Sequence, residues 1–114
     1  MESEDRQDEI AGLVRICGAA ELPRAGGLKC VTVRGREVCL ANVDGHIASL
    51  SNVCPHRGGP LCEGSIEDGR VVCPWHGWAF DSRSGEASHS AQAKVEVFPL
   101  VVRAESVFLD WRPH

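Results

Sequence analysis

Two short segments of the sequence each place a cysteine close to a histidine. One residue separates Cys54 from His56, two residues separate Cys73 from His76, and sixteen residues lie between the two pairs. Thiolates favour iron–sulfur clusters and zinc, and imidazole suits either metal. The spacing therefore predicts one metal centre that takes a thiolate and an imidazole from each of two loops.

Two kinds of metal centre use this set of ligands. A structural zinc site can be Cys₂His₂, but zinc fingers usually pair C-x₂₋₄-C with H-x₃₋₅-H. Here each segment alternates cysteine with histidine, and both segments are also rich in proline, glycine and tryptophan. The pattern favours an iron–sulfur cluster, and zinc stays open as the alternative.

Short strands separated by turns have to bring the two segments together. Turn signals recur along the chain without a long helical period, which is typical of an all-β domain. The Asp68-Gly69 turn between the two segments predicts a hairpin that sets them side by side. Residues 19–22 fit one helical turn. The other turn signals are Arg34-Gly35, Asp44-Gly45 and Ala104-Glu105, and the expected strands are 13–17, 28–33, 36–43, 46–50, 65–67, 70–73, 94–103 and 106–111.

The sequences CPHRGGPL and CPWHGWAFD, which begin at Cys54 and Cys73, resemble the cluster-binding part of the Rieske family. The resemblance implies a β-sandwich base with a small inserted cluster-binding subdomain at about residues 52–81. It also implies one [2Fe–2S] cluster, with Cys54 and Cys73 on the inner iron. His56 and His76 would hold the outer iron, because histidines replace cysteines at a single iron in Rieske centres.

The residues around these ligands suit a cluster as well. Glycines reach positive φ and allow the backbone to approach the cluster, so that amide groups can point at its sulfides. We expect the tryptophans to be an apolar cover for the cluster. An arginine next to a ligand should raise the reduction potential only weakly, because water and salt screen its charge. The residues concerned are Gly58, Gly59 and Gly77, then Trp75 and Trp78, and Arg57.

The sequence departs from the respiratory-chain branch of the family. Those proteins carry an extra cysteine in each cluster loop, at the positions of Gly59 and Trp75, and a serine at the position of Trp78. The chain also contains no tyrosine. Because hydroxyl donors stabilise the reduced cluster, their loss argues for the low-potential branch of ferredoxins and oxygenase domains.

Composition and charge limit the binding partners and the cellular locations that fit the sequence. Residues 1–9 are expected to form an acidic, flexible tail, with five acidic groups against one arginine, and residues 10–114 are expected to form a single domain. The balance of charge in residues 10–114 excludes a nucleic-acid footprint. No apolar run approaches the ~18 residues that span a membrane, and the N-terminus resembles neither a signal nor a transit peptide.

We therefore expect the protein to be cytoplasmic. This location predicts the state of the remaining cysteines. Cytosolic thiols stay reduced, so we expect no disulfide framework. Cys17, Cys30 and Cys39 are predicted to be small buried apolar residues. Cys62 is predicted to be a free thiol that packs under the first loop.

The sequence favours a carrier over an enzyme. It shows no nucleophile–base pair and no array for the mononuclear iron of an oxygenase large subunit. The leading hypothesis is a freestanding ferredoxin that passes single electrons from a flavin reductase to a terminal oxygenase. A small Rieske subunit that works with a nitrite reductase large subunit is the alternative. A cluster-bearing sensor or structural module is a hypothesis of another class.

Overall fold

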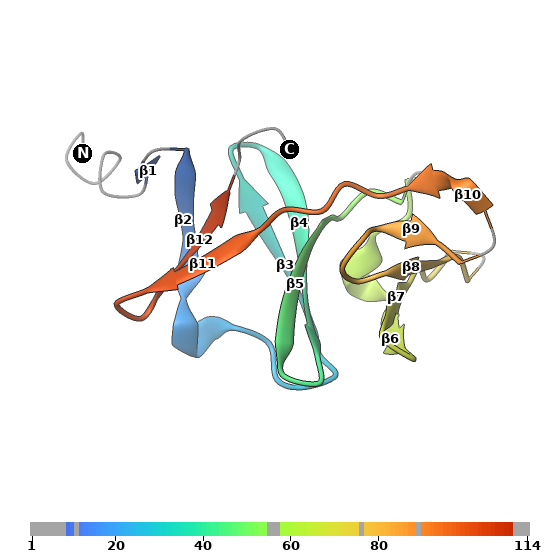
Figure 1. Ribbon diagram of the computed structural model, residues 1–114, viewed down its shortest axis with the longest axis horizontal. Coiled ribbons are helices and arrows are strands. Elements are labelled where there is room, and N and C mark those ends of the chain that lie inside the picture. The colour runs from blue at the N-terminus through green and yellow to red at the C-terminus, as the bar shows by residue number, and fades with distance from the viewer. Residues whose placement is uncertain (1–8, 11, 55–57, 76, 89, 111–114) are drawn as a thin grey trace.

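The computed structural model describes residues 9–10, 12–54, 58–75, 77–88 and 90–110. Within them the chain forms β-strands and two single turns of 3₁₀ helix, which confirms the all-β prediction (Figure 1). No helix in this part of the chain is long and apolar enough to cross a membrane. In order, the elements are β1 (Glu9–Ile10), β2 (Leu13–Gly18), η1 (Ala19–Glu21), β3 (Leu28–Val33), β4 (Arg36–Val43), β5 (His46–Ser51), η2 (Leu61–Glu63), β6 (Ser65–Glu67), β7 (Arg70–Val72), β8 (Ala79–Asp81), β9 (Glu86–Ala87), β10 (Ser90–Lys94), β11 (Leu100–Arg103) and β12 (Ser106–Asp110).

The described strands form three antiparallel sheets that follow one another along the long axis of the molecule (Figure 1). The proximal sheet has the order β1-β2-β12-β11, and the central sheet has the order β3-β4-β5. The distal sheet has the order β10-β9-β8-β7-β6. The proximal and central sheets are the predicted sandwich base, and the distal sheet lies on the other side of the central sheet.

The hairpin turns take the conformation that their residues favour. Asp44 and Gly45 both have positive φ, of 54° and 92°, and so do Asp68 and Gly69, at 52° and 77°. Two-residue turns of this kind match the right-handed twist of the paired strands. The Asp68-Gly69 turn joins β6 to β7, so that the predicted hairpin between the two cysteine segments is confirmed.

The middle strand of the central sheet, β4, is buried on both faces. Val38 and Leu40 of β4 pack into a core shared with β12 of the proximal sheet. Cys39 and Ala41, which alternate with them, pack against the distal sheet and η2. Each buried Val or Leu contributes about 1.5–3 kcal/mol relative to an exposed one. The alternating side chains of β4 therefore face two different apolar cores.

The expected strand at 94–103 is wrong as one element. β10 ends at Lys94 and β11 begins at Leu100, and the residues between, 95–99, form a strap that crosses from the distal to the proximal sheet. The strap follows β5, where the Ser51 amide donates to the Glu96 carbonyl at 2.8 Å. Pro99 has no N–H to continue the pairing.

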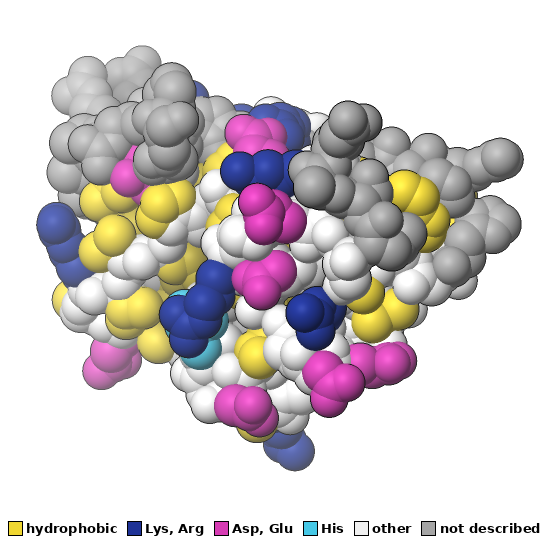
Figure 2. Space-filling view, turned by 45° about the vertical axis from the view of Figure 1, so that its right-hand side comes forward, with side chains coloured by type: hydrophobic (Ala, Val, Ile, Leu, Met, Phe, Trp, Pro, Cys, Tyr) yellow, Lys and Arg dark blue, Asp and Glu magenta, His cyan; other side chains and the backbone are white. Residues whose placement is uncertain are grey.

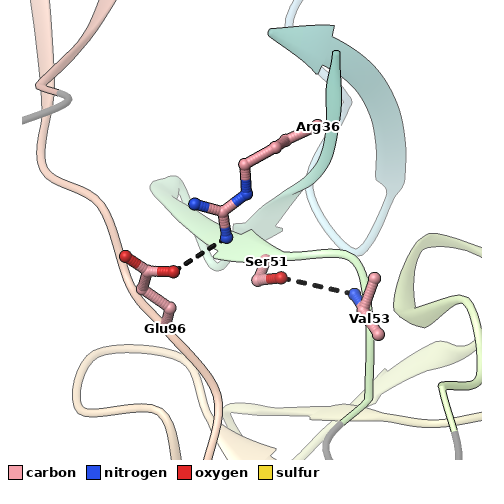
Figure 3. Close-up of polar contacts among 4 residues, drawn as sticks. All are labelled: Arg36, Ser51, Val53 and Glu96. Carbon is pink, nitrogen blue, oxygen red and sulfur yellow. Dashed lines mark hydrogen bonds and ion pairs between the residues drawn. The ribbon is translucent and has the colours of Figure 1, made fainter. Parts of the chain in front are cut away.

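Arg36 holds the strap against the central sheet. Its Nη2 lies 2.8 Å from Glu96 Oε1 (Figure 3), and its guanidinium lies 5.6 Å from the ring centre of Phe98. Figure 3 also shows the end of β5, where the Val53 amide donates to Ser51 Oγ at 3.5 Å. This corner is where the chain leaves the base for the first cysteine segment.

Candidate metal centre

The two predicted cysteine ligands lie together. Cys54 and Cys73 are each 1% exposed, and their thiols are within hydrogen-bonding reach of each other. Burial raises the pKa of the Cys73 thiol, the amide of Trp75 opposes this, and the neighbouring Cys54 raises the pKa further. His56 and His76, and Arg57 next to the first of them, lie outside the described residues.

The first cysteine loop, residues 53–60, closes on itself. Val53 and Pro60 form an antiparallel bridge at its base. The Cys54 amide donates to the Gly59 carbonyl at 2.9 Å, and the Gly58 amide donates to the Cys54 carbonyl at 2.7 Å. Gly58 has a φ of 78°, as expected of a glycine needed for positive φ. These bonds hold the backbone of Cys54 in one position.

Gly59 serves the site in a different way from the one expected. Its φ is not positive, so the expectation of a left-handed backbone at this residue is wrong. A Cβ at this position would instead lie 2.7 Å from Cys73 Sγ and 3.0 Å from Cδ2 of Trp75. The two loops therefore lie in close contact at Gly59, and the missing side chain leaves room for the second thiol.

The second cysteine loop, residues 73–78, is short and closed by its own ends. The Cys73 amide donates to the Trp78 carbonyl at 2.7 Å, and the Trp75 amide points at Cys73 Sγ at 3.4 Å. Gly77 has a φ of 72°, as expected. The tryptophans differ: Trp78 is half-buried with its ring centre 6.3 Å from that of Phe80, whereas Trp75 is 48% exposed. An apolar cover fits Trp78 better than Trp75.

Asn52 is a structural residue of the site that the sequence analysis missed. It is 2% exposed. Its amide donates to the Glu37 carbonyl at 3.0 Å, and its Nδ2 donates to Glu37 Oε1 at 3.1 Å. Its carbonyl accepts from the Leu61 amide at 2.9 Å, and its Oδ1 accepts from the Cys62 amide at 2.7 Å. The available signal was a polar residue directly between a strand and a predicted metal loop.

The remaining cysteines follow their predictions with one exception. Cys17 and Cys39 are buried, and Cys62 is a half-buried free thiol, as expected. Cys30 is exposed, so the prediction that it is buried is wrong. It lies on β3, an edge strand of the central sheet, which a pattern of apolar residues does not distinguish from a covered strand.

The described part of the site fits the inner half of a Rieske centre. Two adjacent thiols shielded from water suit one iron, and a backbone amide aimed at one of them suits the negative charge of a metal-bound thiolate. Among the residues that the structure describes, no third Cys, His, Asp or Glu completes a metal-binding group.

Comparison with known proteins decides the family. Residues 12–99 match the family model of the Rieske [2Fe-2S] domain. The chain belongs to the Rieske family. It is 31% identical to the ferredoxin component of the alkene monooxygenase system of Xanthobacter autotrophicus, over 94% of this chain and 87% of that one.

A longer protein and a solved structure are also similar to this chain. The chain is 47% identical to the vanillate O-demethylase oxygenase subunit of a Pseudomonas species, over 48% of this chain. It spans only 16% of the length of that subunit. Its fold matches the Sphingomonas yanoikuyae B1 ferredoxin with a TM-score of 0.78 and 26% identity, over 89% of this chain and 99% of that one.

Proposed function

We propose that this Rieske protein is a one-electron carrier whose [2Fe–2S] cluster is held by Cys54, His56, Cys73 and His76. The observation that carries the proposal is the meeting of the Cys54 and Cys73 thiols, each 1% exposed, at the contact between two loops. Cys54 and Cys73 hold the inner iron, and His56 and His76 hold the outer iron. When bound, the cluster supplies a one-electron couple of Rieske type.

The residues of the chain set the surroundings of that couple. Burial of the two cysteines excludes water, and the Trp75 amide stabilises negative charge on Cys73 Sγ. At the position of Trp78, the respiratory-chain proteins have a serine whose hydroxyl would stabilise the reduced cluster. Trp78 packs there but donates no such hydroxyl hydrogen bond. The proposal therefore places the reduction potential in the lower part of the Rieske span, which runs from about −150 to about +300 mV.

The surface beside the loops suits a partner protein. Val53 and Trp75, at 55% and 48% exposed, are large apolar side chains that flank the two cysteines. Exposed apolar side chains of this kind, when grouped, mark interaction sites. We propose that this end of the molecule docks redox partners, which exchange electrons through the edge of His56 or His76. The protein is a carrier and not itself an enzyme.

The partners proposed are a flavin reductase as electron donor and a terminal oxygenase as acceptor. The support is the ferredoxin component of an alkene monooxygenase system, which this chain matches over nearly the length of both proteins. The cytoplasm is the proposed location, because none of the six cysteines is in a disulfide, as is usual for cytosolic cysteines.

The test begins with protein purified without oxygen. We expect iron and acid-labile sulfide in equal amounts, and a Rieske-type EPR spectrum after reduction. Zinc without sulfide would end the proposal. The chemically reduced protein is then mixed with the oxygenase encoded nearest to its gene. Reoxidation at a rate that rises with oxygenase concentration supports the partner, whereas transfer to a nitrite reductase, or to neither enzyme, contradicts it.

A further inference from the structure

Three cysteines outside the proposed ligand set gather between the base and the first cysteine loop. Cys30 of β3 and Cys39 of β4 face each other in the register of the two strands. Cys62 belongs to η2, which packs against both strands, and its thiol is within hydrogen-bonding reach of the Cys30 thiol. Cys39 is fully buried, Cys62 is half-buried and Cys30 is exposed.

This group is suited to thiol chemistry rather than to a metal. Among the described residues, no three Cys, His, Asp or Glu side chains have a metal-binding arrangement. Solvent reaches Cys30 on the edge strand, and a second thiol lies next to it. An exposed thiol with a neighbouring thiol that can resolve a mixed disulfide is the usual arrangement of a redox-responsive cysteine pair.

We propose that Cys30 and Cys62 are an oxidisable pair, and that their disulfide ties η2 to β3. The oxidant is a low-molecular-weight disulfide, RSSR. The Cys30 thiolate attacks one sulfur and forms a Cys30–SR bond, and RS⁻ leaves and takes a proton. Cys62 then loses its proton to water and attacks the Cys30 sulfur, so that the second RS⁻ leaves. Two protein thiols give two electrons and two protons, and RSSR becomes two RSH.

Cys62 resolves the mixed disulfide because it is nearer to solvent than Cys39. Burial raises the pKa of Cys39 to about 12. Burial and the adjacent Cys30 thiol together raise the pKa of Cys62 to about 12. The Cys30 contribution ends once that sulfur is bonded to RS, and the Asn52 hydrogen bond favours the Cys62 thiolate. Because the thiolate is the nucleophile, the reaction accelerates as the pH rises.

A disulfide between Cys30 and Cys62 would affect the metal site through the backbone hydrogen bonds of η2. η2 follows the first cysteine loop directly, and the amides of Leu61 and Cys62 are bonded to Asn52 at the start of that loop. A disulfide from η2 to β3 limits local opening, in which these bonds break. The oxidised protein should therefore exchange these two amides with solvent more slowly than the reduced protein.

The test uses the unmutated protein with its cluster bound. Oxidised glutathione is added at several pH values, and intact mass and linked peptides are measured after the free thiols are blocked. We expect the loss of two hydrogen atoms and a peptide that joins Cys30 to Cys62, formed faster at higher pH. A Cys30–Cys39 link, a stable glutathione adduct on Cys30, or no reaction would overturn the proposal.

Three variants and one further measurement sharpen the result. Cys62→Ser should trap glutathione on Cys30, Cys30→Ser should leave Cys62 unreacted, and Cys17→Ser should still form the link. An adduct on Cys62 in Cys30→Ser would contradict the order of attack. Hydrogen exchange of residues 60–64 should slow severalfold in the oxidised protein. Unchanged exchange would overturn the tie between η2 and β3.

Discussion

The two cysteine loops meet at one site but are held in different ways. The first loop depends on a polar residue next to it, since Asn52 bonds β4 on one side and η2 on the other. The second loop is closed by its own backbone, and Trp78 packs beside Phe80 of the distal sheet. One cysteine is thus fixed to the central sheet by hydrogen bonds, and the other is fixed to the distal sheet by apolar packing.

This difference determines how substitutions should destabilise each loop. A buried polar group left without its partner costs about 1–3 kcal/mol, so that a single change at Asn52 affects several bonds together. Apolar packing is spread over many weak contacts and is lost more gradually. The first loop should therefore depend on one residue, whereas the second should tolerate conservative changes around Trp78.

The largest expected effect tests whether both loops are needed to bind the cluster. Cys54→Ser and Cys73→Ser should each abolish or convert the native cluster, because each removes one proposed bond to iron. Visible absorption and iron content measure this. Cys62→Ser and Cys17→Ser are the matched controls and should keep the cluster. Loss of the cluster in Cys62→Ser would contradict the ligand assignment.

The next prediction compares Asn52, which anchors the first loop, with Asn42, an asparagine elsewhere on the central sheet. Asn52→Ala should lower the free energy of unfolding by about 2–3 kcal/mol, because the Cys62 amide loses its buried acceptor. Asn42→Ala, in which Nδ2 loses the Pro23 carbonyl and Oδ1 loses the Gly45 amide, should cost about 1 kcal/mol. Denaturant unfolding gives both values.

Hydrogen exchange distinguishes the two asparagine variants. Only Asn52→Ala should speed exchange in residues 58–64, because Asn42 lies at the far end of β4. Equal acceleration in both variants would show that the loop has no specific anchor at Asn52.

A smaller effect compares glycines in the two loops. In Gly59→Ala the new Cβ would meet Cys73 Sγ, so the loops have to separate, at about 1–3 kcal/mol. In Gly77→Ala the space is open and the cost is the positive φ alone, about 1 kcal/mol. Thermal unfolding measures the stability, and the visible spectrum reports on the cluster. We expect a changed spectrum in Gly59→Ala, and equal spectra would refute the close contact.

The smallest expected effect lies outside both loops, at the Arg36–Glu96 pair. Glu96→Gln should lower the free energy of unfolding by at most about 1 kcal/mol, because both side chains are roughly half exposed. The difference from the unmutated protein should shrink in high salt. A loss as large as that of Asn52→Ala would show that the strap, rather than Asn52, positions the first loop.

Much of the fold was predictable because its signals are local. The Asp44-Gly45 and Asp68-Gly69 turns depend on backbone preferences of adjacent residues, and both occur as expected. The strands β3, β4 and β6 have the predicted bounds for the same reason. The meeting of the two cysteines was also predictable, since the Asp68-Gly69 hairpin between their loops was expected to set them side by side, and their thiols do meet.

What the sequence alone determined is the set of short strands, their turns and the two cysteine loops. Only the tertiary structure decided that β4 is covered on both faces, that Cys30 is exposed, and that the strap at 95–99 breaks the expected strand. It also decided the roles of Asn52 and Gly59. The physical reason is that local preference depends on neighbours in the chain, whereas burial, close approach and the satisfaction of a buried amide depend on residues brought together from distant segments.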